Sequence, residues 1–283
     1  KDDGSFRLND QYFDYPVGSK MTNEKFHNLF NGLPRDSENE PLTQFHMDLA
    51  ASIQEVTEEI ILKICRSIKD EFKIKNLCLA GGVALNCVIN GKILKEKIFD
   101  DVWVQPAAGD AGGSLGAALS YWFSHIKNER VVDSSDSMQG SFLGPSFKQE
   151  DIEKRLKNIG ANFEIFDEKK IIELTSDEII KNSAIGWFQG KMEFGPRSLG
   201  SRSIIANSKS KEMQKNLNRK IKYRESFRPF APSLLIEDLN KWFELDKESP
   251  YMSFVAKIKS EHIIKNQMIK KIEEKNLEQI NNI

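Results

Sequence analysis

The sequence predicts an α/β protein of two modules, the second of which has α+β character. Two strand–turn–helix units with glycine-rich turns follow one another between Leu77 and Phe123, a pattern typical of parallel strands covered by helices. Turn-forming residues at 133–140 separate this part from one in which elements alternate less regularly. We therefore expect one domain at residues 1–137 and a second at residues 138–283.

The first domain opens with residues 1–41, whose content of Asp, Asn, Gly and Pro predicts an irregular segment. Apolar side chains then recur at spacings of three and four residues, which predicts one long helix over Thr43–Phe72. The two units that follow are expected as a buried strand at Leu77–Ala80, a helix at Val83–Lys95, a second buried strand at Val102–Val104 and a helix at Ala111–Phe123.

In the second domain, short helical patterns alternate with short apolar runs. Helices are predicted at Asp151–Ile159, Ile171–Asn182 and Ser210–Ile221, and strands at Phe163–Phe166, Ala184–Phe188, Phe230–Leu235 and Tyr251–Ile258. Residues from His262 to Ile283 have a helical arrangement without a clear cap, so they predict either a surface helix or the start of a region that continues.

The composition narrows the classes of function. The chain has 283 residues and a net charge of −1, made of 41 basic and 42 acidic residues, which argues against a general nucleic-acid or membrane-surface protein. Cys65, Cys78 and Cys87 are too few and too scattered for a disulfide framework, and Cys78 is expected to be buried in its strand. No apolar run approaches the roughly 20 residues of a membrane span. These features predict a cytoplasmic protein with neither nucleic acid nor membrane as a partner.

The two glycine-rich turns are the first candidate site. Glycines at a strand end allow close backbone approach, and a helix that begins after them directs N–H groups at an anion such as a phosphate. The alternative for Gly81 and Gly82 is a tight connection without a ligand. Asp110 lies at a predicted helix start, where it is either an N-cap, the more common role, or a carboxylate ligand of a metal.

The second candidate site is a set of cations in Gly- and Pro-containing loops of the second domain. It comprises Lys191, Arg197, Arg202, Arg224 and Arg228. Guanidinium groups match the geometry of phosphate and carboxylate, so a phosphorylated substrate is the expected partner, and a solvated surface is the alternative. The Lys residues of 209–222 follow no fixed spacing, which favours a solvated face there. The four histidines are far apart, and the sequence has neither a P-loop nor a nucleophile elbow.

Four motifs carry a family resemblance, and they occur in the family's order between residues 45 and 258. They are Gly81-Gly82-Val83-Ala84-Leu85-Asn86, Gln105-Pro106-Ala107-Ala108-Gly109-Asp110-Ala111-Gly112-Gly113, the run from Gly186 to Gly200, and Phe227-Arg228-Pro229-Phe230-Ala231-Pro232. Together they resemble the O-carbamoyltransferases of the nodulation-protein and antibiotic-tailoring type. Members of that family join an actin/Hsp70-like ATPase-fold domain, similar to the tRNA threonylcarbamoyltransferase, to a domain similar to the enzyme that makes threonylcarbamoyl-adenylate.

The resemblance implies a reaction in two steps. The second module would bind carbamoyl phosphate and ATP and form carbamoyl-adenylate, and the first would transfer the carbamoyl group to a hydroxyl of a sugar-like or small-molecule acceptor. A divalent metal, iron in the family with magnesium as the alternative, would help to hold the adenylate.

The resemblance also implies roles for particular residues. Asp110 matches the family's metal-binding aspartate, which favours the ligand over the N-cap. The turns that contact ATP or the adenylate would include Gly81, Gly82, Asn86, Gly109, Gly112 and Gly113. The cationic motifs would place Lys191, Arg197 and Arg228 on the phosphates as the catalytic residues.

The sequence departs from the family at both ends. The family's histidine pair for the metal belongs to an earlier half of the first module, and its chain continues past the position of Ile283. The chain is therefore expected to be the latter half of the ATPase-fold domain followed by the N-terminal part of the adenylate-forming domain, and to have little transferase activity by itself. Two alternatives stay open: a small-molecule kinase of the actin/Hsp70 superfamily, and an inactive nucleotide-binding remnant.

Overall fold

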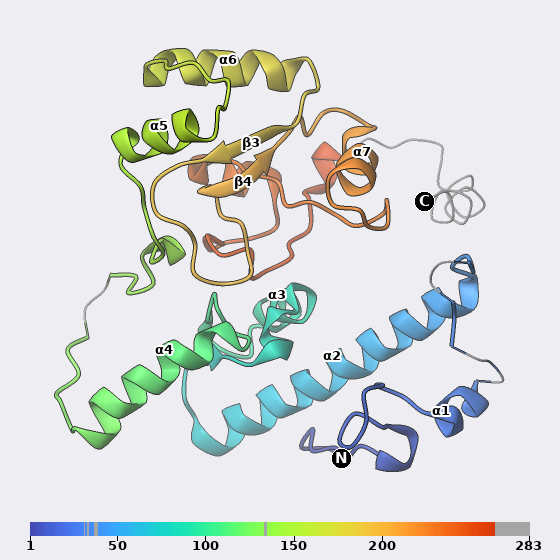
Figure 1. Cartoon of the computed structure of the whole chain (residues 1–283). Helices are drawn as coiled ribbons and strands as arrows, with labels where there is room; N and C mark the ends of the chain where they lie inside the picture. The colour runs from blue at the N-terminus through green and yellow to red at the C-terminus, as the bar shows by residue number, and fades with distance from the viewer. Residues whose placement is uncertain (31, 33, 37–38, 133–134, 264–283) are drawn as a thin grey trace. The chain divides into compact units, whose positions relative to one another are not determined.

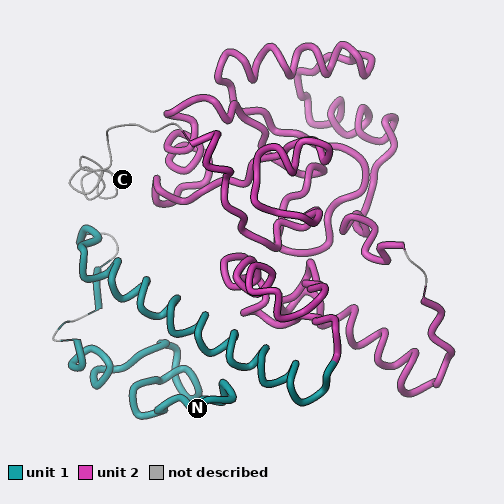
Figure 2. The backbone as a smooth tube through the Cα atoms, turned by 180° about the vertical axis from the view of Figure 1, so that it is seen from behind, with its two compact units in different colours: residues 1–73, 267–283 teal, residues 74–266 magenta. Residues whose placement is uncertain are grey.

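The computed structural model describes residues 1–30, 32, 34–36, 39–132 and 135–263. The chain divides into two compact units, residues 1–73 with 267–283 and residues 74–266 (Figure 2). The architecture is mixed α/β and mostly helical, and the described residues form two two-stranded sheets, both in the second unit (Figure 1). The domain boundary predicted after residue 137 lies within this unit and stays a prediction.

The first unit contains α1 (Glu24–Leu29) and the long helix α2 (Gln44–Phe72). The prediction of α2 is confirmed. The irregular segment before it contains α1, which the sequence pattern did not indicate because the helix has only six residues. The N-cap of α1 is Asn23, whose side-chain oxygen accepts the N–H groups of Lys25 and Phe26 at 3.1 and 3.3 Å. The segment also approaches α2 closely: a Cβ on Gly4 would lie 2.5 Å from the backbone nitrogen of Ile64.

The second unit begins with a parallel β–α–β arrangement. Strands β1 (Asn76–Leu79) and β2 (Asp101–Val104) pair in parallel, and α3 (Cys87–Lys95) connects them after a 3₁₀ turn at Gly82–Leu85. These elements confirm the predicted strand–turn–helix order. The core beneath them includes Ile89, Ile93, Val102 and Val104, each at most 4% exposed. The expected burial of β1 is wrong: Cys78 is exposed, because the sheet has two strands and β1 is covered only in part.

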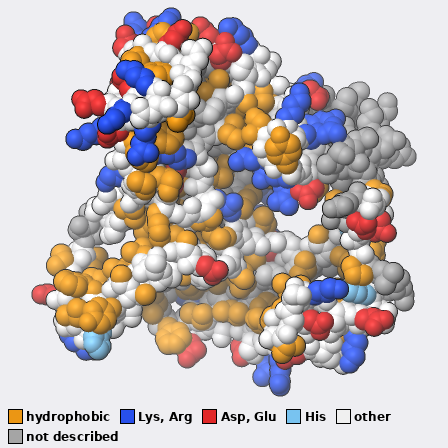
Figure 3. All heavy atoms as spheres, in the orientation of Figure 1, with side chains coloured by type: hydrophobic (Ala, Val, Ile, Leu, Met, Phe, Trp, Pro, Cys, Tyr) orange, Lys and Arg blue, Asp and Glu red, His pale blue; other side chains and the backbone are white. Residues whose placement is uncertain are grey.

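Helix α4 (Ala111–Ser120) follows β2 and continues as a π-helical turn at Tyr121–His125. The prediction of a helix at Ala111–Phe123 is thus confirmed, although none of its residues is buried. Apolar side chains face solvent along its second half and just after its end, as Figure 3 shows, and they include Leu119, Tyr121, Trp122 and Ile126. The first half of α4 is rich in small residues and includes Gly112 and Gly113 of the second glycine turn.

The remaining elements are α5 (Gln149–Asn158), α6 (Glu168–Ile180), β3 (Ile185–Phe188), β4 (Arg202–Ile205), α7 (Met213–Lys220) and α8 (Leu239–Trp242). The three predicted helices and the strand before residue 189 are confirmed. Strand β4 pairs antiparallel with β3 and was not predicted. Residues 264–283, most of the predicted C-terminal helical segment, lie outside the described residues.

Three predicted strands are wrong: residues 163–166, 230–235 and 251–258 have no strand, apart from an isolated bridge at Ile258. The last of these segments instead packs against α3. The amide of Asn90 donates to Ser253 O at 3.0 Å, and Val255 N donates to Cys87 O at 3.1 Å. We call residues 251–255 the strap. The alternating pattern of the strap thus reflects packing on a helix rather than strand pairing.

The strap requires a glycine on the helix that it crosses. A Cβ on Gly91 would lie 2.3 Å from Val255 O, which is a backbone atom and has to move. We therefore expect Gly91→Ala to lower the free energy of unfolding by about 1–3 kcal/mol. Gly116→Ala, which changes a helical glycine with no atom within 4 Å of the new Cβ, is the control. Urea denaturation of both variants tests this, and equal midpoints would contradict close packing of the strap.

Candidate functional site

The two glycine turns lie together at the ends of the parallel strands. Gly81 N donates to Ala108 O at 2.8 Å, so the backbone itself joins the first turn to the second. Gly81 has a φ of +99°, which favours glycine, whereas a Cβ on Gly81 or Gly82 would meet no atom within 4 Å. The space above the first turn is therefore open. Gly109 in the second turn lies close to the first turn, because a Cβ added to Gly109 would be 3.7 Å from the side chain of Leu85.

Asn86 ends the first turn and starts the helix after it. Its side-chain oxygen accepts the N–H of Ile89 at 3.3 Å, which is an N-cap interaction with α3. The neighbouring Asn90 is 1% exposed and donates to Ala84 O at 2.8 Å. Both asparagines thus hold the turn against its helix. Contact of Asn86 with a nucleotide stays a prediction.

Asp110 is exposed at the start of α4, and its side chain makes no capping hydrogen bond. Its backbone carbonyl accepts Gly113 N at 3.0 Å, while Gly112 N donates to Gly109 O at 3.1 Å. The N-cap alternative therefore does not describe its carboxylate. Within the described ranges no three or more His, Cys, Asp or Glu side chains group in a way that could hold a metal ion. Asp110 can supply one ligand, and the described residues do not complete the site.

A cation-bearing loop, residues 189–202, is organised around a buried carboxylate. Glu193 is 8% exposed. Its Oε1 accepts the N–H groups of Leu199 and Ser201, each at 2.8 Å, and of Arg202 at 3.3 Å. Burial raises the pKa of this carboxyl, but these three backbone N–H groups together with the N–H of Glu193 itself outweigh that effect, so its pKa is lowered overall. Glu193 thus stays ionised within the loop at neutral pH.

This loop contacts both glycine turns. Arg197 Nη2 donates to Leu85 O in the first turn at 3.2 Å. Gly195, at a φ of +128°, lies against the second turn: its Cβ would be 3.2 Å from Pro106 O and 3.4 Å from the Cα of Ala107. The structure therefore brings the two sequence-predicted sites together at Arg197, although the motifs are about a hundred residues apart.

The other cations of the loop differ in their surroundings. Lys191 is exposed. Arg202 is less available, because its guanidinium lies 3.4 Å from the ring centroid of Phe188 and donates to the carbonyls of Gln189 and Gly190 at 2.7 and 3.2 Å. Arg202 therefore shapes the loop, Lys191 is exposed on it, and Arg197 is the side chain that reaches the first glycine turn.

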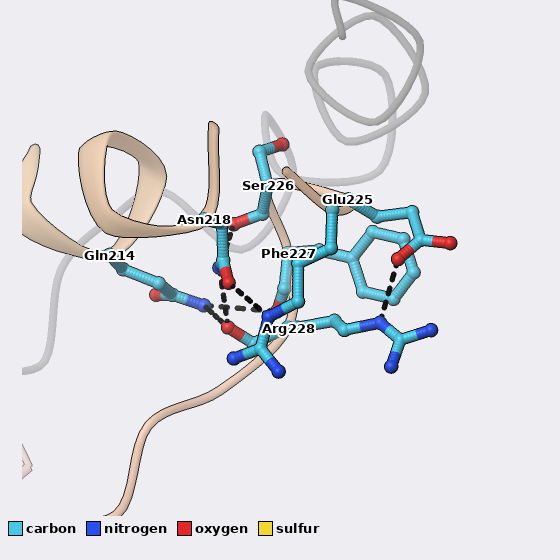
Figure 4. A network of polar contacts seen from close by, with 7 residues as sticks. Gln214, Asn218, Glu225, Ser226, Phe227 and Arg228 are labelled. Atoms are coloured by element: carbon cyan, nitrogen blue, oxygen red, sulfur yellow. Dashed lines mark hydrogen bonds and ion pairs between the residues drawn. The ribbon is translucent and has the colours of Figure 1, made fainter. Parts of the chain in front are cut away.

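Arg224 and Arg228 lie on a second loop after α7, which Figure 4 shows from close by. Asn218 is fully buried, donates to Ser226 O and Arg228 O at 3.1 and 2.8 Å, and accepts from Arg224 Nε at 2.6 Å. Arg228 Nε pairs with Glu225 at 2.6 Å. Among the described residues, no hydrogen bond or ion pair joins Arg228 to Arg197, Lys191 or the glycine turns. The predicted shared role of Arg228 stays a prediction.

The rest of α7 fits the solvated face that the sequence indicated. Lys and Arg side chains gather around this helix (Figure 3), and Arg219 and Lys220 are exposed. Its buried side is formed by Met213, Leu217 and Asn218. The sequence pattern did not identify Glu193 and Asn218 as the residues that hold the two cation-bearing loops. Two sequence features could have indicated them: Glu193 is a lone acid among cations and glycines, and Asn218 lies on the apolar side of a basic helix.

The second loop depends on the buried amide. We expect Asn218→Ala to lower the free energy of unfolding by about 2 kcal/mol, because two carbonyls and one guanidinium N–H lose their partner. Asn216→Ala on the exposed side of the same helix is the control, with an expected change within about 0.5 kcal/mol. Thermal unfolding followed by circular dichroism measures both, and similar midpoints for the two variants would contradict the role of Asn218.

Two protein-family models match this chain. The family model described as "Carbamoyltransferase N-terminus" matches residues 1–119, and the one described as "Carbamoyltransferase C-terminus" matches residues 176–280. The glycine turns lie in the first match, and both cation-bearing loops lie in the second.

Individual proteins are similar to this chain over most of its length. The uncharacterized protein sll1178 of Synechocystis is 52% identical over 263 residues, which cover 92% of this chain and 43% of that protein. The nodulation protein NolNO of Sinorhizobium fredii is 42% identical over 224 residues, with coverages of 77% and 32%. The nodulation protein NolO of Bradyrhizobium diazoefficiens is 41% identical over 226 residues, with coverages of 77% and 40%. The chain thus spans less than half the length of these relatives, and it belongs to the carbamoyltransferase family.

Proposed function

We propose that the protein of which this chain is part transfers a carbamoyl group from carbamoyl phosphate to a hydroxyl of a sugar-like or small-molecule acceptor, at the expense of ATP. The observation that carries the proposal is the contact between Arg197 and Leu85, which brings a cation-bearing loop onto two open glycine turns. Anionic phosphates fit such a place, because guanidinium, ammonium and backbone N–H groups all stabilise negative charge.

The chemistry balances in two steps. Carbamoyl phosphate, ATP and one water yield carbamoyl-adenylate, inorganic phosphate and pyrophosphate. The acceptor oxygen then attacks the carbamoyl carbon, AMP leaves, and the hydroxyl proton is released. Lys191, Arg197 and Arg228 are assigned to phosphate oxygens of carbamoyl phosphate or ATP, where they offset developing negative charge. Gly81, Gly82, Asn86, Gly109, Gly112 and Gly113 are assigned to the walls of the adenylate site.

The finer fold assignment is part of the same proposal. We assign β1, α3, β2 and α4 to an actin/Hsp70-like ATPase fold, supported by the parallel pairing of β1 with β2 around a connecting helix. The part from residue 138 on is assigned to an adenylate-forming, carbamoyl-phosphate-binding domain.

A divalent metal, iron or magnesium, is assigned to Asp110 as one ligand only. When bound, such an ion would help to hold the adenylate phosphate. Because the described residues of this chain do not complete its coordination, the steps above do not pass through it.

We assign the protein to the cytoplasm, because all three cysteines of this chain are free thiols. In the described part of the chain, no helix has both the length and the apolar character needed to cross a bilayer.

The test is carbamoyl-phosphate-dependent exchange of labelled pyrophosphate into ATP by the full-length protein, followed by product analysis with a panel of hydroxylated sugars. Exchange that requires carbamoyl phosphate supports the proposal. ATP consumption that is independent of carbamoyl phosphate would indicate a kinase instead, and nucleotide binding without exchange would indicate an inactive remnant. The 283-residue chain alone is expected to give little or no carbamoylated product.

A further inference from the structure

We infer that Glu193 is the positioning residue of the cation-bearing loop, holding Arg197 in place for a phosphorylated substrate. This inference rests on the proposed function. Glu193 is a buried acid within a loop whose other charged side chains are Lys191, Arg197 and Arg202, and it pairs with none of them. Its partners are backbone N–H groups, so its role is to fold the loop rather than to neutralise a neighbouring cation.

The carboxylate is itself fixed from both sides by the backbone. Met192 N donates to Pro145 O at 3.0 Å, and Gly144 N donates to Met192 O at 2.9 Å. On the other side, Phe194 N donates to Ser141 O at 2.7 Å. Residues before and after Glu193 are therefore anchored to the segment 141–145, which leaves the acid as a stationary acceptor.

The acid in turn closes the loop around Arg197. Its three donors, at positions 199, 201 and 202, all follow Arg197, while Glu193 precedes it by four residues. The segment 194–198 is thereby closed into a ring and directed at the glycine turns, where Arg197 reaches Leu85 O. Without Glu193, three N–H groups would lose their acceptor, and Arg197 would lose the backbone frame that aims it.

One consequence concerns how the loop recognises an anion. The N–H groups of Leu199, Ser201 and Arg202 are occupied by Glu193, so they are not free to bind phosphate. An anion at this part of the loop is therefore expected to meet the Arg197 side chain rather than these three N–H groups. With three basic residues and one acid the loop keeps a net positive charge, which attracts a phosphorylated substrate.

The test compares Glu193→Ala with Glu193→Gln in the full-length protein. The glutamine keeps an oxygen that accepts the three N–H groups but removes the charge. Glu164→Ala, at an exposed position, is the control. We expect amide hydrogen exchange at residues 199–202 to become about tenfold faster or more in the alanine variant, and to stay within about threefold of wild type in the glutamine variant.

The kinetic readout separates positioning from general damage. In ATP–pyrophosphate exchange, we expect Glu193→Ala to raise KM for carbamoyl phosphate about tenfold while the rate at saturation changes less, and Glu193→Gln to restore KM. A fall in rate with unchanged KM, or a glutamine variant as impaired as the alanine variant, would overturn the inference. If wild type shows no exchange, the proposed function fails, and hydrogen exchange still decides whether Glu193 holds the loop.

Discussion

Replacing Arg197 by alanine in the full-length protein is expected to lower carbamoyl-phosphate-dependent ATP–pyrophosphate exchange about 100- to 1,000-fold. Arg197 is the residue at which the two candidate sites meet, because its Nη2 donates to Leu85 O at 3.2 Å. Its removal takes away both a guanidinium that can contact phosphate oxygens and the link between the loop and the first turn. The remaining donors of that guanidinium are the ones assigned to the substrate.

Two further variants decide which loss matters. Arg197→Lys keeps the charge but not the planar fork, so it is expected to recover only part of the rate. Arg130→Ala removes an exposed arginine outside the site and is expected to leave exchange unchanged. A rate for Arg197→Ala close to that of Arg130→Ala would remove Arg197 from the catalytic residues.

The second large effect concerns the second glycine turn. A Cβ on Gly112 would lie 2.1 Å from Ala107 O, whereas a Cβ on Gly113, the next residue of the same helix, would meet no atom within 4 Å. We expect Gly112→Ala to lower the free energy of unfolding by about 3 kcal/mol, because a backbone carbonyl in a buried turn has to move. Gly113→Ala is expected to be neutral or to stabilise by up to about 1 kcal/mol, as for a helical glycine with free space around it.

Urea denaturation of the two variants gives a matched comparison, since they make the same substitution at adjacent positions. ATP binding adds a second readout. Gly112→Ala is expected to weaken ATP binding, because Ala107 directly precedes Ala108, whose carbonyl accepts Gly81 N from the first turn. Equal stability of the two variants would show that the close approach of Gly112 to Ala107 is not required.

The sequence allowed the glycine turns to be predicted because their determinants are local. A short apolar strand, a glycine pair and a helix start lie within ten residues of one another, and the structure has all three at Asn76–Leu79, Gly81–Gly82 and Cys87–Lys95. Strand β4 was missed for the opposite reason. Arg202–Ile205 follows a loop rich in Gly and Ser, and it becomes a strand through its pairing with β3.

In the candidate site, too, some features are determined locally and others depend on tertiary contacts. Lys191, Arg197 and Arg228 stand out by residue type, but their surroundings depend on partners that no local pattern reveals. Glu193 accepts N–H groups six to nine residues away, and Asn218 lies on α7 but holds the loop that follows this helix. Contacts of this kind arise from tertiary folding, so sequence periodicity identifies the cations and not the residues that orient them.

The strap has a consequence for biosynthesis. Asn90 and its acceptor Ser253 are separated by 163 positions, so a ribosome adding about 5–20 residues per second completes the acceptor roughly 10–30 s after the donor. During that interval the α3 surface that Ser253 and Val255 later cover remains open to water. Nascent chains arrested before position 251 should accordingly be better substrates for chaperones than chains released after it.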